Sequence, residues 1–413
     1  MFQKIFFQFE EQLDVVNEEN RGDGHVAFLH KRWAGIAADS QFFHIGPAGK
    51  KFRNISGNLL MNALQPELSV IIPTLNEEIA IADLFASLAT QTGISLEVVI
   101  SDGGSTDDTC RRAESLAARC GIRMQLVTGA SGRGAQMNAA VAASRGKHLL
   151  FLHADSRFAE SSALRKGADI LAEYGDTTVA AKFALRFGDI AAPQSLGYYF
   201  YESKARLLRP ECSHGDQGLL ITRSSFDHLG PFDTFPPMLA ETRLADKVRA
   251  QGRLLLIPAE LLTSARRFEA EGLQRRQTIN AILMNCAGQK WDEPFRAIAD
   301  LYRDQSATGE LQLFPILDRV KRLIVALPRK ERRSFWERTG SYVRGNAWQL
   351  AFFLDVRRNF KKGIAPGNGP TPVLDGFDRH IAPLLDNKGF NLLATVLTWA
   401  WFNYIRRRSR VHS

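Results

Sequence analysis

The distribution of apolar and polar positions changes at about residue 66, after which short apolar runs alternate with segments of helical periodicity. Residues 68–72 form an apolar run followed by Pro73, which predicts a buried strand that ends there. Residues 77–88 have apolar side chains at helical spacing. The same pattern predicts strands over 96–100, 123–127 and 148–152 and helices over 107–118 and 135–143. Repeated strand–helix units with continuous apolar strands are typical of a mostly parallel sheet sandwiched by helices, so we expect a Rossmann-like α/β fold.

The pattern is less regular in the rest of the chain. Residues 219–222 read as a strand and 241–250 as a helix, and beyond about residue 274 the chain reads as helices with a Gly/Pro-rich break at 365–370. We therefore expect three regions, which are a loosely ordered N-terminal extension over 1–66, an α/β domain over 67–275 and a helical, basic C-terminal region over 276–413.

Composition excludes several classes of protein. With 45% hydrophobic and 23% charged residues the chain is globular, and its 32 Gly and 16 Pro are too few for a collagen-like or Pro/Gly-rich disordered protein. The four cysteines show no C-x-x-C spacing, so neither a zinc knuckle nor a disulfide framework is indicated. The first residues lack the apolar run and charges of a secretory signal peptide. We expect a cytoplasmic protein.

Charge is distributed unevenly along the chain. Residues 321–413 contain 18 Lys or Arg and 6 Asp or Glu, a net charge of +12, whereas residues 1–320 contain 35 and 38, a net charge of −3. Such asymmetry predicts a polyanionic partner for the C-terminal region, either nucleic acid or an anionic membrane surface.

The loops that follow the predicted strands should hold the chemistry, because ligands of parallel sheets bind at the carboxyl ends of the strands. These loops are Gly-rich or acidic, but they contain neither a P-loop nor the G-x-G-x-x-G spacing, and there is no G-x-S-x-G motif. Acidic residues remain at three strand ends, Glu77, Asp102 and Asp155. Grouped carboxylates can hold a ribose hydroxyl or a divalent cation that neutralises a diphosphate. The alternative is that they cap the following helices.

The sequence resembles the family 2 glycosyltransferases with the type A nucleotide-sugar-binding fold in four segments, which are residues 68–78, 98–109, 132–138 and 150–156. The sequence is most similar to a bacterial subgroup that also has a Gly-Asp-Gln element, here Gly215-Asp216-Gln217, and a Thr-Ser-Ala-Arg-Arg element, here over 263–267. The resemblance covers about residues 68–275.

This resemblance implies a nucleotide-diphospho-sugar donor, most often a UDP-sugar, and a divalent cation, Mn²⁺ or Mg²⁺. Asp155 matches the last acid of the metal-binding D-x-D motif, whose first acid is replaced by His153. Imidazole suits these cations less well than carboxylate does. The resemblance further implies that the donor contacts Pro73, Thr74, Asn76, Glu77, Asp102, Gly104, Arg133, Asn138 and Asp155.

Transfer also needs a general base for the acceptor hydroxyl. The resemblance places Glu241 at the base position, with Asp216 near the acceptor or donor sugar. The alternative for Glu241 is a surface helix that carries an acid in its first turn. Arg266 and Arg267 suit a diphosphate, or else lie in a solvated loop, and His214 is expected to be a plain surface histidine.

Residues 389–405 contain no charge and are followed by a basic run at 406–410. A helix of this length reaches about 25 Å, short of the roughly 30 Å hydrocarbon core. Asn391, Thr395 and Thr398 form a polar stripe, so we predict an interfacial helix anchored by aromatic and arginine side chains. The alternative is a core helix packed on the α/β domain.

Taken together, these features predict an inverting, metal-assisted glycosyltransferase at the inner membrane surface, with a lipid-linked or polymer-precursor acceptor. The alternative is a degenerate transferase that binds nucleotide-sugar without catalysis, as His153 and Ala240 suggest. Nucleic-acid binding lacks any recognised module.

Overall fold

The computed structural model describes residues 65–413 except 130, 176, 189–194, 237–238, 307–308 and 412–413. The predicted extension over 1–66 therefore lies almost wholly outside the described residues. Residues 66–413 belong to one compact unit.

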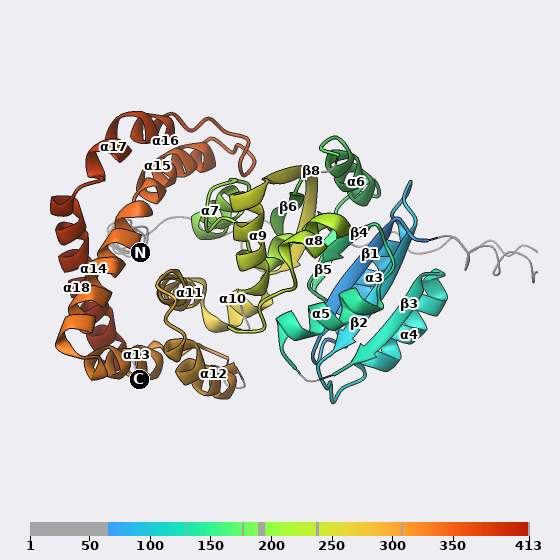
Figure 1. Cartoon of the computed structure of the whole chain (residues 1–413), viewed down its shortest axis with the longest axis horizontal. Coiled ribbons are helices and arrows are strands. Elements are labelled where there is room, and N and C mark those ends of the chain that lie inside the picture. Colours follow the sequence, from blue (N-terminus) through green and yellow to red (C-terminus); the bar gives the residue numbers. More distant parts are fainter. Residues whose placement is uncertain are drawn as a thin grey trace, which may run out of the picture. The chain divides into compact units, whose positions relative to one another are not determined.

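An eight-stranded sheet forms the centre of the first part of this unit (Figure 1). Its strand order is β3-β2-β1-β4-β7-β6-β8-β5. The strands β3, β2, β1 and β4 run parallel, β7 is antiparallel to β4 and to β6, and β8 runs parallel to β6 and antiparallel to β5. The strands are β1 Leu68–Thr74, β2 Leu96–Asp102, β3 Arg123–Thr128, β4 His148–Phe151, β5 Ser156–Phe158, β6 Val179–Gly188, β7 Leu219–Thr222 and β8 Arg253–Ser264.

Helices cover both faces of the sheet, as predicted. Along β1, Leu68, Val70 and Ile72 point to one face and Ile71 to the other, because successive side chains of a strand alternate. The first face packs against α3 (Ile81–Ala89), α4 (Thr109–Cys120) and α6 (Ala163–Ala172). The second packs against α5 (Arg133–Ala143), α8 (Arg223–Leu229) and α9 (Ala240–Gln251). The carboxyl ends of β1, β2 and β4 are thus held by two apolar layers.

Several predicted boundaries differ from the structure by a few residues, and two of them adjoin the loop after β1. The strand expected to end before Pro73 continues to Thr74, and Pro73 pairs with Ser101 of β2. On its other side β1 pairs with β4 only as far as Ile71, so Pro73 has a strand neighbour on one side alone, where a proline is tolerated. The helix expected from residue 77 begins at Ile81, because Glu77 belongs to the loop that follows β1.

Helices make up the rest of the described unit, in agreement with the predicted helical C-terminal region. They are α7 Leu196–Ala205, α10 Arg266–Glu271, α11 Leu273–Gly288, α12 Glu293–Ser306, α13 Leu313–Ala326, α14 Arg329–Gly345, α15 Trp348–Lys361, α16 Pro372–Gly376, α17 Ala382–Leu385 and α18 Lys388–Val411, with short turns of other helix types at Gly215–Gln217 and Phe377–Ile381. The α7 helix joins the two parts: it contacts β6 and α15, and Phe200 packs on Phe352 with ring centroids 5.5 Å apart.

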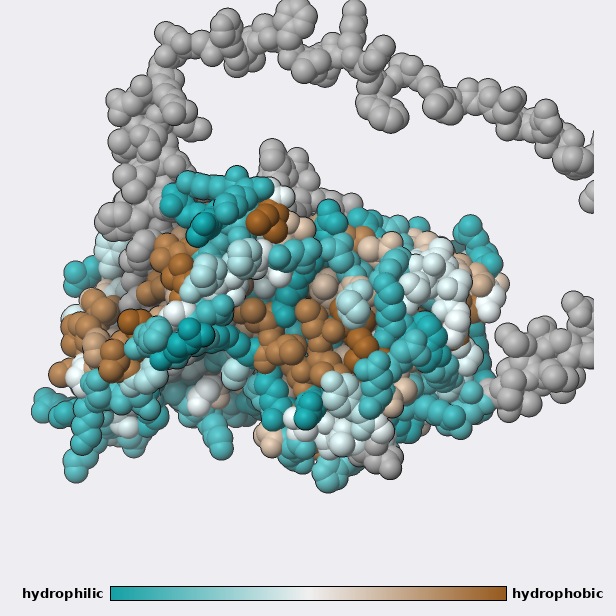
Figure 2. All heavy atoms as spheres, turned by 90° about the horizontal axis from the view of Figure 1, so that it is seen from above, coloured by the Kyte–Doolittle hydropathy of each residue, from teal (hydrophilic) through white to brown (hydrophobic). Residues whose placement is uncertain are grey.

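The polar stripe of the last helix, α18, faces the rest of the protein. Thr398 is buried, and a side chain at Gly340 of α14 would collide with Thr395, so the stripe faces the protein and α18 lies close against α14. The α18 helix also contacts α13. Its other side is apolar and exposed, and Figure 2 shows hydrophobic residues gathered at the end where Figure 1 places α17 and α18. The exposed apolar residues of α18 are Phe390, Leu392, Leu393, Val396, Leu397, Trp399 and Tyr404.

Among the described residues, no helix combines the length and the apolar character that crossing a bilayer requires. The four cysteines are all free thiols, in agreement with the sequence analysis.

Candidate active site

The carboxylate of Asp102 organises the loop after β2. Thr74 Oγ1 donates to Asp102 Oδ1 at 3.1 Å, and the backbone N–H groups of Gly104 and Ser105 donate to Oδ2 at 2.9 and 2.8 Å. Burial alone would raise the pKa of Asp102, but the hydrogen bonds from Ser105, Gly104 and Thr74 outweigh it and hold the pKa below its usual value. Gly104 has φ +95°, a conformation that favours glycine.

The loop after β1 is bonded to the loop after β2. Asn76, at φ +57°, accepts a hydrogen bond from the Thr106 N–H at 2.8 Å and donates its own N–H to Ser105 Oγ at 2.8 Å. The Glu77 N–H donates to Thr109 Oγ1 at 2.8 Å. The structure therefore brings these predicted residues together at one edge of the sheet, where their contacts with a donor stay a prediction.

The strand-end acids do not cap the following helices, which was the alternative to a binding site. The N-cap residues of α3, α4, α5 and α6 are Ala80, Asp108, Gly132 and Ser162, and none of them caps its helix through a side-chain hydrogen bond. Helix capping therefore does not explain why Glu77, Asp102 and Asp155 lie at strand ends.

A cavity of about 550 Å³ opens beside these loops. It collects residues from β1, α5, the loop after β4, α9 and α10 that are far apart in the sequence. The predicted site residues that line it are Pro73, Glu77, Arg133, His153, Asp155, Asp216, Glu241 and Arg267. Thr74, Asn76, Asp102, Gly104, Asn138 and Arg266 are not in its lining.

Glu241 is buried in the first turn of α9, with 4% of its surface exposed, so the alternative of a surface helix is wrong at this position. The Nε of Arg133 donates to Glu241 Oε1. His153 Nε2 lies 3.9 Å from the same oxygen, and His153 Nδ1 lies 4.0 Å from Asp155 Oδ1. A side chain at Gly215 would collide with Glu241 and His153, so only glycine allows this packing.

Burial shifts the pKa values of Asp155 and of its neighbours Glu77 and His153. Burial raises the pKa of the Asp155 carboxyl, against the opposing charges of Arg267 and Arg133. Burial and the charge of Asp155 raise the pKa of Glu77. Burial, with Arg133 and Arg267, holds the pKa of His153 well below its usual value, so its imidazole is neutral at neutral pH and can act as a metal ligand.

These residues offer part of a cation site. Asp155 Oδ1 and His153 Nε2 are buried and lack a hydrogen-bond partner. Within the described ranges, no three His, Cys, Asp or Glu side chains gather in an arrangement that could hold a metal ion. Mg²⁺ is commonly held by one or two protein ligands together with the phosphates of a substrate. The pair therefore fits a cation that arrives with a diphosphate.

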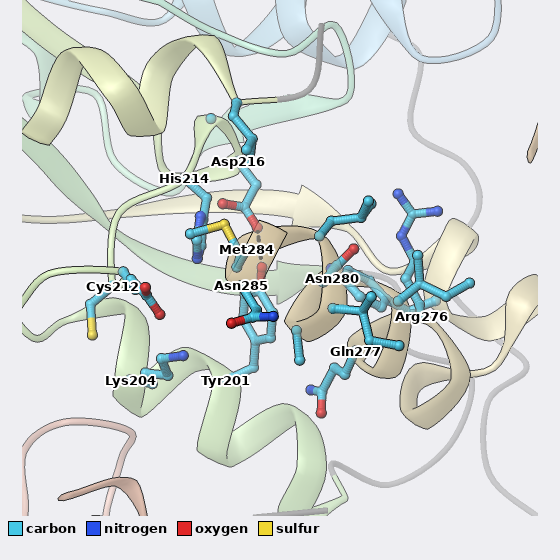
Figure 3. Close-up of a pocket in the computed structure, with 18 of the residues that line it drawn as sticks. Tyr201, Lys204, Cys212, His214, Asp216, Arg276, Gln277, Asn280, Met284 and Asn285 are labelled. Carbon is cyan, nitrogen blue, oxygen red and sulfur yellow. Dashed lines mark hydrogen bonds between the residues drawn. The ribbon is translucent and has the colours of Figure 1, made fainter. Parts of the chain in front are cut away.

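Asp216 projects into the same cavity and is held by a residue that the sequence analysis missed. The Tyr201 hydroxyl, from α7, donates to Asp216 Oδ2 at 2.9 Å (Figure 3). Asp216 Oδ1 is buried without a partner. Burial, with the nearby charge of Asp155, raises the pKa of Asp216 to about 6, although the Tyr201 hydrogen bond opposes this. No local sequence signal identifies Tyr201, because α7 reaches the site only through packing.

His214 is not the plain surface histidine that we expected. It is half-buried and lines the cavity (Figure 3). Its Nδ1 lies 3.3 Å from Thr242 Oγ1. Burial, together with the charges of Lys204, Lys182 and Arg249, lowers its pKa to about 3, so the ring is neutral. Its position directly before Gly215-Asp216-Gln217 was the signal that could have indicated it.

The remaining predicted residues have mixed surroundings. Arg266 and Arg267 are both exposed at the start of α10, and only Arg267 lines the cavity. Asn138 exchanges two hydrogen bonds with the backbone of Phe232, at 3.0 and 2.9 Å, and so holds that segment. The Nη2 of Arg133 is buried without a partner, which leaves it free for an anionic ligand.

Comparison with known proteins bears on the chemistry of this cavity. Residues 69–230 match the family model described as glycosyl transferase family 2. A PGL/p-HBAD biosynthesis glycosyltransferase from Mycobacterium bovis is 29% identical over 181 residues, which are 43% of this chain and 67% of that protein. The poly(ribitol-phosphate) beta-N-acetylglucosaminyltransferase TarS from Staphylococcus aureus is 31% identical over 119 residues, 28% of this chain and 21% of TarS.

Solved structures of this kind are more distant. The mannosyltransferase PcManGT from Pyrobaculum calidifontis, in complex with GDP-Man and Mn²⁺, aligns with 82% of this chain and 88% of its own, with a TM-score of 0.42 and 18% identity. The sequence matches carry the assignment: residues 69–230 form a glycosyl transferase family 2 domain, and the chain that contains it is a glycosyltransferase.

Proposed function

We propose that the protein transfers a sugar, with inversion, from a nucleotide-diphospho-sugar to a hydroxyl group of an acceptor, with a UDP-sugar as the first donor to test. One observation carries the proposal. Seven predicted site residues, four of them carboxylates, line one cavity at the carboxyl ends of the parallel strands, where α/β sheets bind their ligands. They are Glu77, Asp155, Asp216, Glu241, Arg133, Arg267 and His153.

The position of the loops supports a donor orientation. The base and ribose would lie over the joined loops at Thr74, Asn76 and Asp102, next to Pro73 and Glu77. The diphosphate would then lie between Arg133 and Arg267, since guanidinium groups match phosphate oxygens. Arg266 and Asn138 would act at the edge of this site.

Asp155 and His153 would hold a divalent cation, Mn²⁺ or Mg²⁺, which when bound neutralises the charge of the leaving diphosphate. The unpartnered atoms of these two side chains support this assignment. The charge of Asp155 also adds to the effect of burial in raising the pKa of both Glu77 and Asp216.

The acceptor's proton would pass to one of two carboxylates. Glu241 is the candidate that the family resemblance indicates, but Oε1 is already bonded to Arg133. Asp216 has an unpartnered oxygen and a pKa of about 6, close to the pH at which a general base works best. In either case the sugar C1 forms a bond to the acceptor oxygen as its bond to the diphosphate breaks.

Turnover of purified protein with UDP-sugars in Mn²⁺, measured as release of UDP, tests the proposal. We expect Glu241→Gln or Asp216→Asn, whichever removes the base, to lower turnover by about 10²- to 10⁴-fold with donor affinity nearly unchanged. Asp227→Asn, an exposed acid on α8, is the matched control. Near-normal turnover in both cavity variants would refute the assignment of the base.

Donor binding is tested separately. Asp155→Ala should remove the Mn²⁺-dependent part of UDP-sugar affinity in calorimetry, because the cation would lose its carboxylate ligand. Unchanged affinity in Mn²⁺ would contradict the cation site.

We propose further that α18 rests on an anionic membrane surface, on the cytoplasmic side. Its outward-facing apolar residues include Leu393 at 52%, Val396 at 54% and Trp399 at 52% exposure, and its last turns carry the basic run 406–410. Basic groups near an anionic leaflet contribute about 1 kcal/mol each and are sensitive to salt, whereas the apolar contact is not. This combination is typical of an interfacial helix.

Sedimentation with anionic liposomes tests this surface in the full chain. Wild-type protein should sediment and be only partly released by high salt, whereas Leu393→Glu with Val396→Glu should stay largely in the supernatant. The control is Val325→Glu, which changes an exposed valine of α13. Equal partitioning of all three proteins would require the membrane assignment to be withdrawn.

A further inference from the structure

The cavity that contains the candidate active site has a second half that the proposed chemistry does not use. From Asp216 it continues between α11, α13, α14 and α18. We call this second half the apolar chamber, and its lining includes Ile324, Phe335, Val343, Trp401 and Phe402. Each of these residues is less than a tenth exposed.

The polarity of the cavity changes gradually between its two ends. The middle part is lined by polar side chains, which include the hydroxyl of Tyr201 and the amides of Asn280 and Asn285 (Figure 3). The charged side chains of Lys204 and Arg276 lie in the same part of the cavity (Figure 3). One end therefore offers carboxylates and arginines, the middle offers hydroxyl, amide and charged groups, and the far end offers apolar and aromatic side chains. A ligand that matches all three parts is amphiphilic.

The chamber also contains polar atoms that no other part of the described structure satisfies. Trp401 Nε1 and Thr398 Oγ1 are buried without a hydrogen-bond partner, and both residues line the cavity. Protein interiors are normally close-packed and their buried polar groups are normally paired. A cavity of about 550 Å³ with these features lies in the range of built ligand sites.

We propose that the acceptor is an amphiphile whose hydroxyl-bearing head lies between Asp216 and Glu241 and whose apolar chain occupies the apolar chamber. The proposal rests on the proposed function, because the cavity is continuous with the reaction site. It identifies the acceptor class as a hydroxyl compound carried on a hydrocarbon chain, rather than a free sugar or a soluble polymer.

Binding affinity should depend on the length of the ligand's hydrocarbon chain. Burial of one methylene contributes about 0.8 kcal/mol, which corresponds to about fourfold in affinity. Affinity for a homologous series with one head group should therefore rise by about fourfold per methylene and level off when the chamber is filled.

Alkyl glucosides from ethyl to decyl, each below its micelle concentration, are the probes, and calorimetry with the full chain measures their affinity. Ile324→Trp, 3% exposed in the wild type, should fill the chamber and remove the dependence on chain length. Val325→Trp adds the same indole one residue further along α13, at a position that is 53% exposed and outside the lining, and should leave the dependence unchanged. Chain-length dependence that survives in Ile324→Trp would place the probe elsewhere and overturn the proposal.

A second measurement needs no chamber-filling variant and so does not depend on how Ile324→Trp folds. Trp336 and Trp401 line the cavity, so an octyl glucoside brominated near the end of its chain should quench their fluorescence. Trp401→Phe should reduce the quenched fraction, and quenching that is unchanged in this variant would contradict occupation of the chamber.

The two proposals fail in different ways. Absence of nucleotide-diphosphate release from UDP-sugars and from the other nucleotide-diphospho-sugars, to water or to acceptor, with chain-dependent binding intact, would refute the proposed function and leave the chamber as an amphiphile site. Normal UDP release with binding that is indifferent to chain length would overturn the chamber proposal alone.

Discussion

The raised pKa of Asp216 means that the ionised carboxylate destabilises the fold. Replacing it by Asn removes the charge and keeps an oxygen that can accept the Tyr201 hydrogen bond. We therefore expect Asp216→Asn to unfold at higher denaturant concentration than the wild type at neutral and alkaline pH, even where it loses catalytic activity.

The magnitude and sign follow from the two pKa values. The pKa of Asp216 is about 6 in the folded protein and 3.8 ordinarily, a difference of about two pKa units at about 1.4 kcal/mol each. Between these values the folded state binds more protons than the unfolded state, so wild-type stability falls as the pH rises from about 4 to about 6. Above that range the ionised carboxylate lowers the free energy of unfolding by about 3 kcal/mol, which is an upper limit because the side chain is only half-buried.

Denaturant unfolding followed by fluorescence, at about pH 5 and at about pH 8, measures the effect. The free energy of unfolding of Asp216→Asn should exceed that of the wild type by more at about pH 8 than at about pH 5. Asp227→Asn, in which the replaced acid is exposed, should show no such growth. A difference that is the same at both pH values would refute the argument that burial of Asp216 raises its pKa.

Three further outcomes are expected. Gly215→Ala should displace the Glu241 side chain and lower turnover by at least about tenfold, with a nearly unchanged melting temperature as the check on folding. Asp155→Asn should lower the pKa of Asp216, because it removes a neighbouring negative charge, and should move the acidic limb of the pH–rate profile to lower pH if Asp216 is the base. Gly340→Val should separate α14 from α18 and destabilise the protein by about 1–3 kcal/mol in denaturant unfolding, and an unchanged midpoint would contradict the close packing there.

The first half of the sheet could be predicted from the sequence because its strands are continuous apolar runs between Gly-rich or acidic loops. That reading placed β1 to β4 in order and identified the loops at Asp102 and Asp155. In the second half of the sheet, the sequence predicted β7, over residues 219–222, but not β5, β6 or β8. In β6, Lys182 is 1% exposed and its ammonium group donates to the carbonyls of Leu207 and Cys212, which satisfies a charge that the sequence pattern assigns to solvent.

The candidate site shows the same division. The family motifs indicated Asp216 and Glu241, but the sequence could not show that Tyr201 from a separate helix holds Asp216. Nor could it show that the polar side of α18 faces inward, since a stripe of threonine and asparagine has the same spacing whichever way the helix is turned. Both facts depend on contacts between segments that are distant in the chain.

The place of α18 in chain order has a consequence for synthesis. All the candidate reaction-site residues lie between 73 and 267, so a ribosome has already made them when α18 is still to come. Until α18 is added, α13 and α14 lack the helix that packs against them and shares the cavity lining with Ile324 and Phe335. Nascent chains at this stage would present these apolar side chains to chaperones, and chains that stop there would carry the reaction site without the wall that completes the apolar chamber.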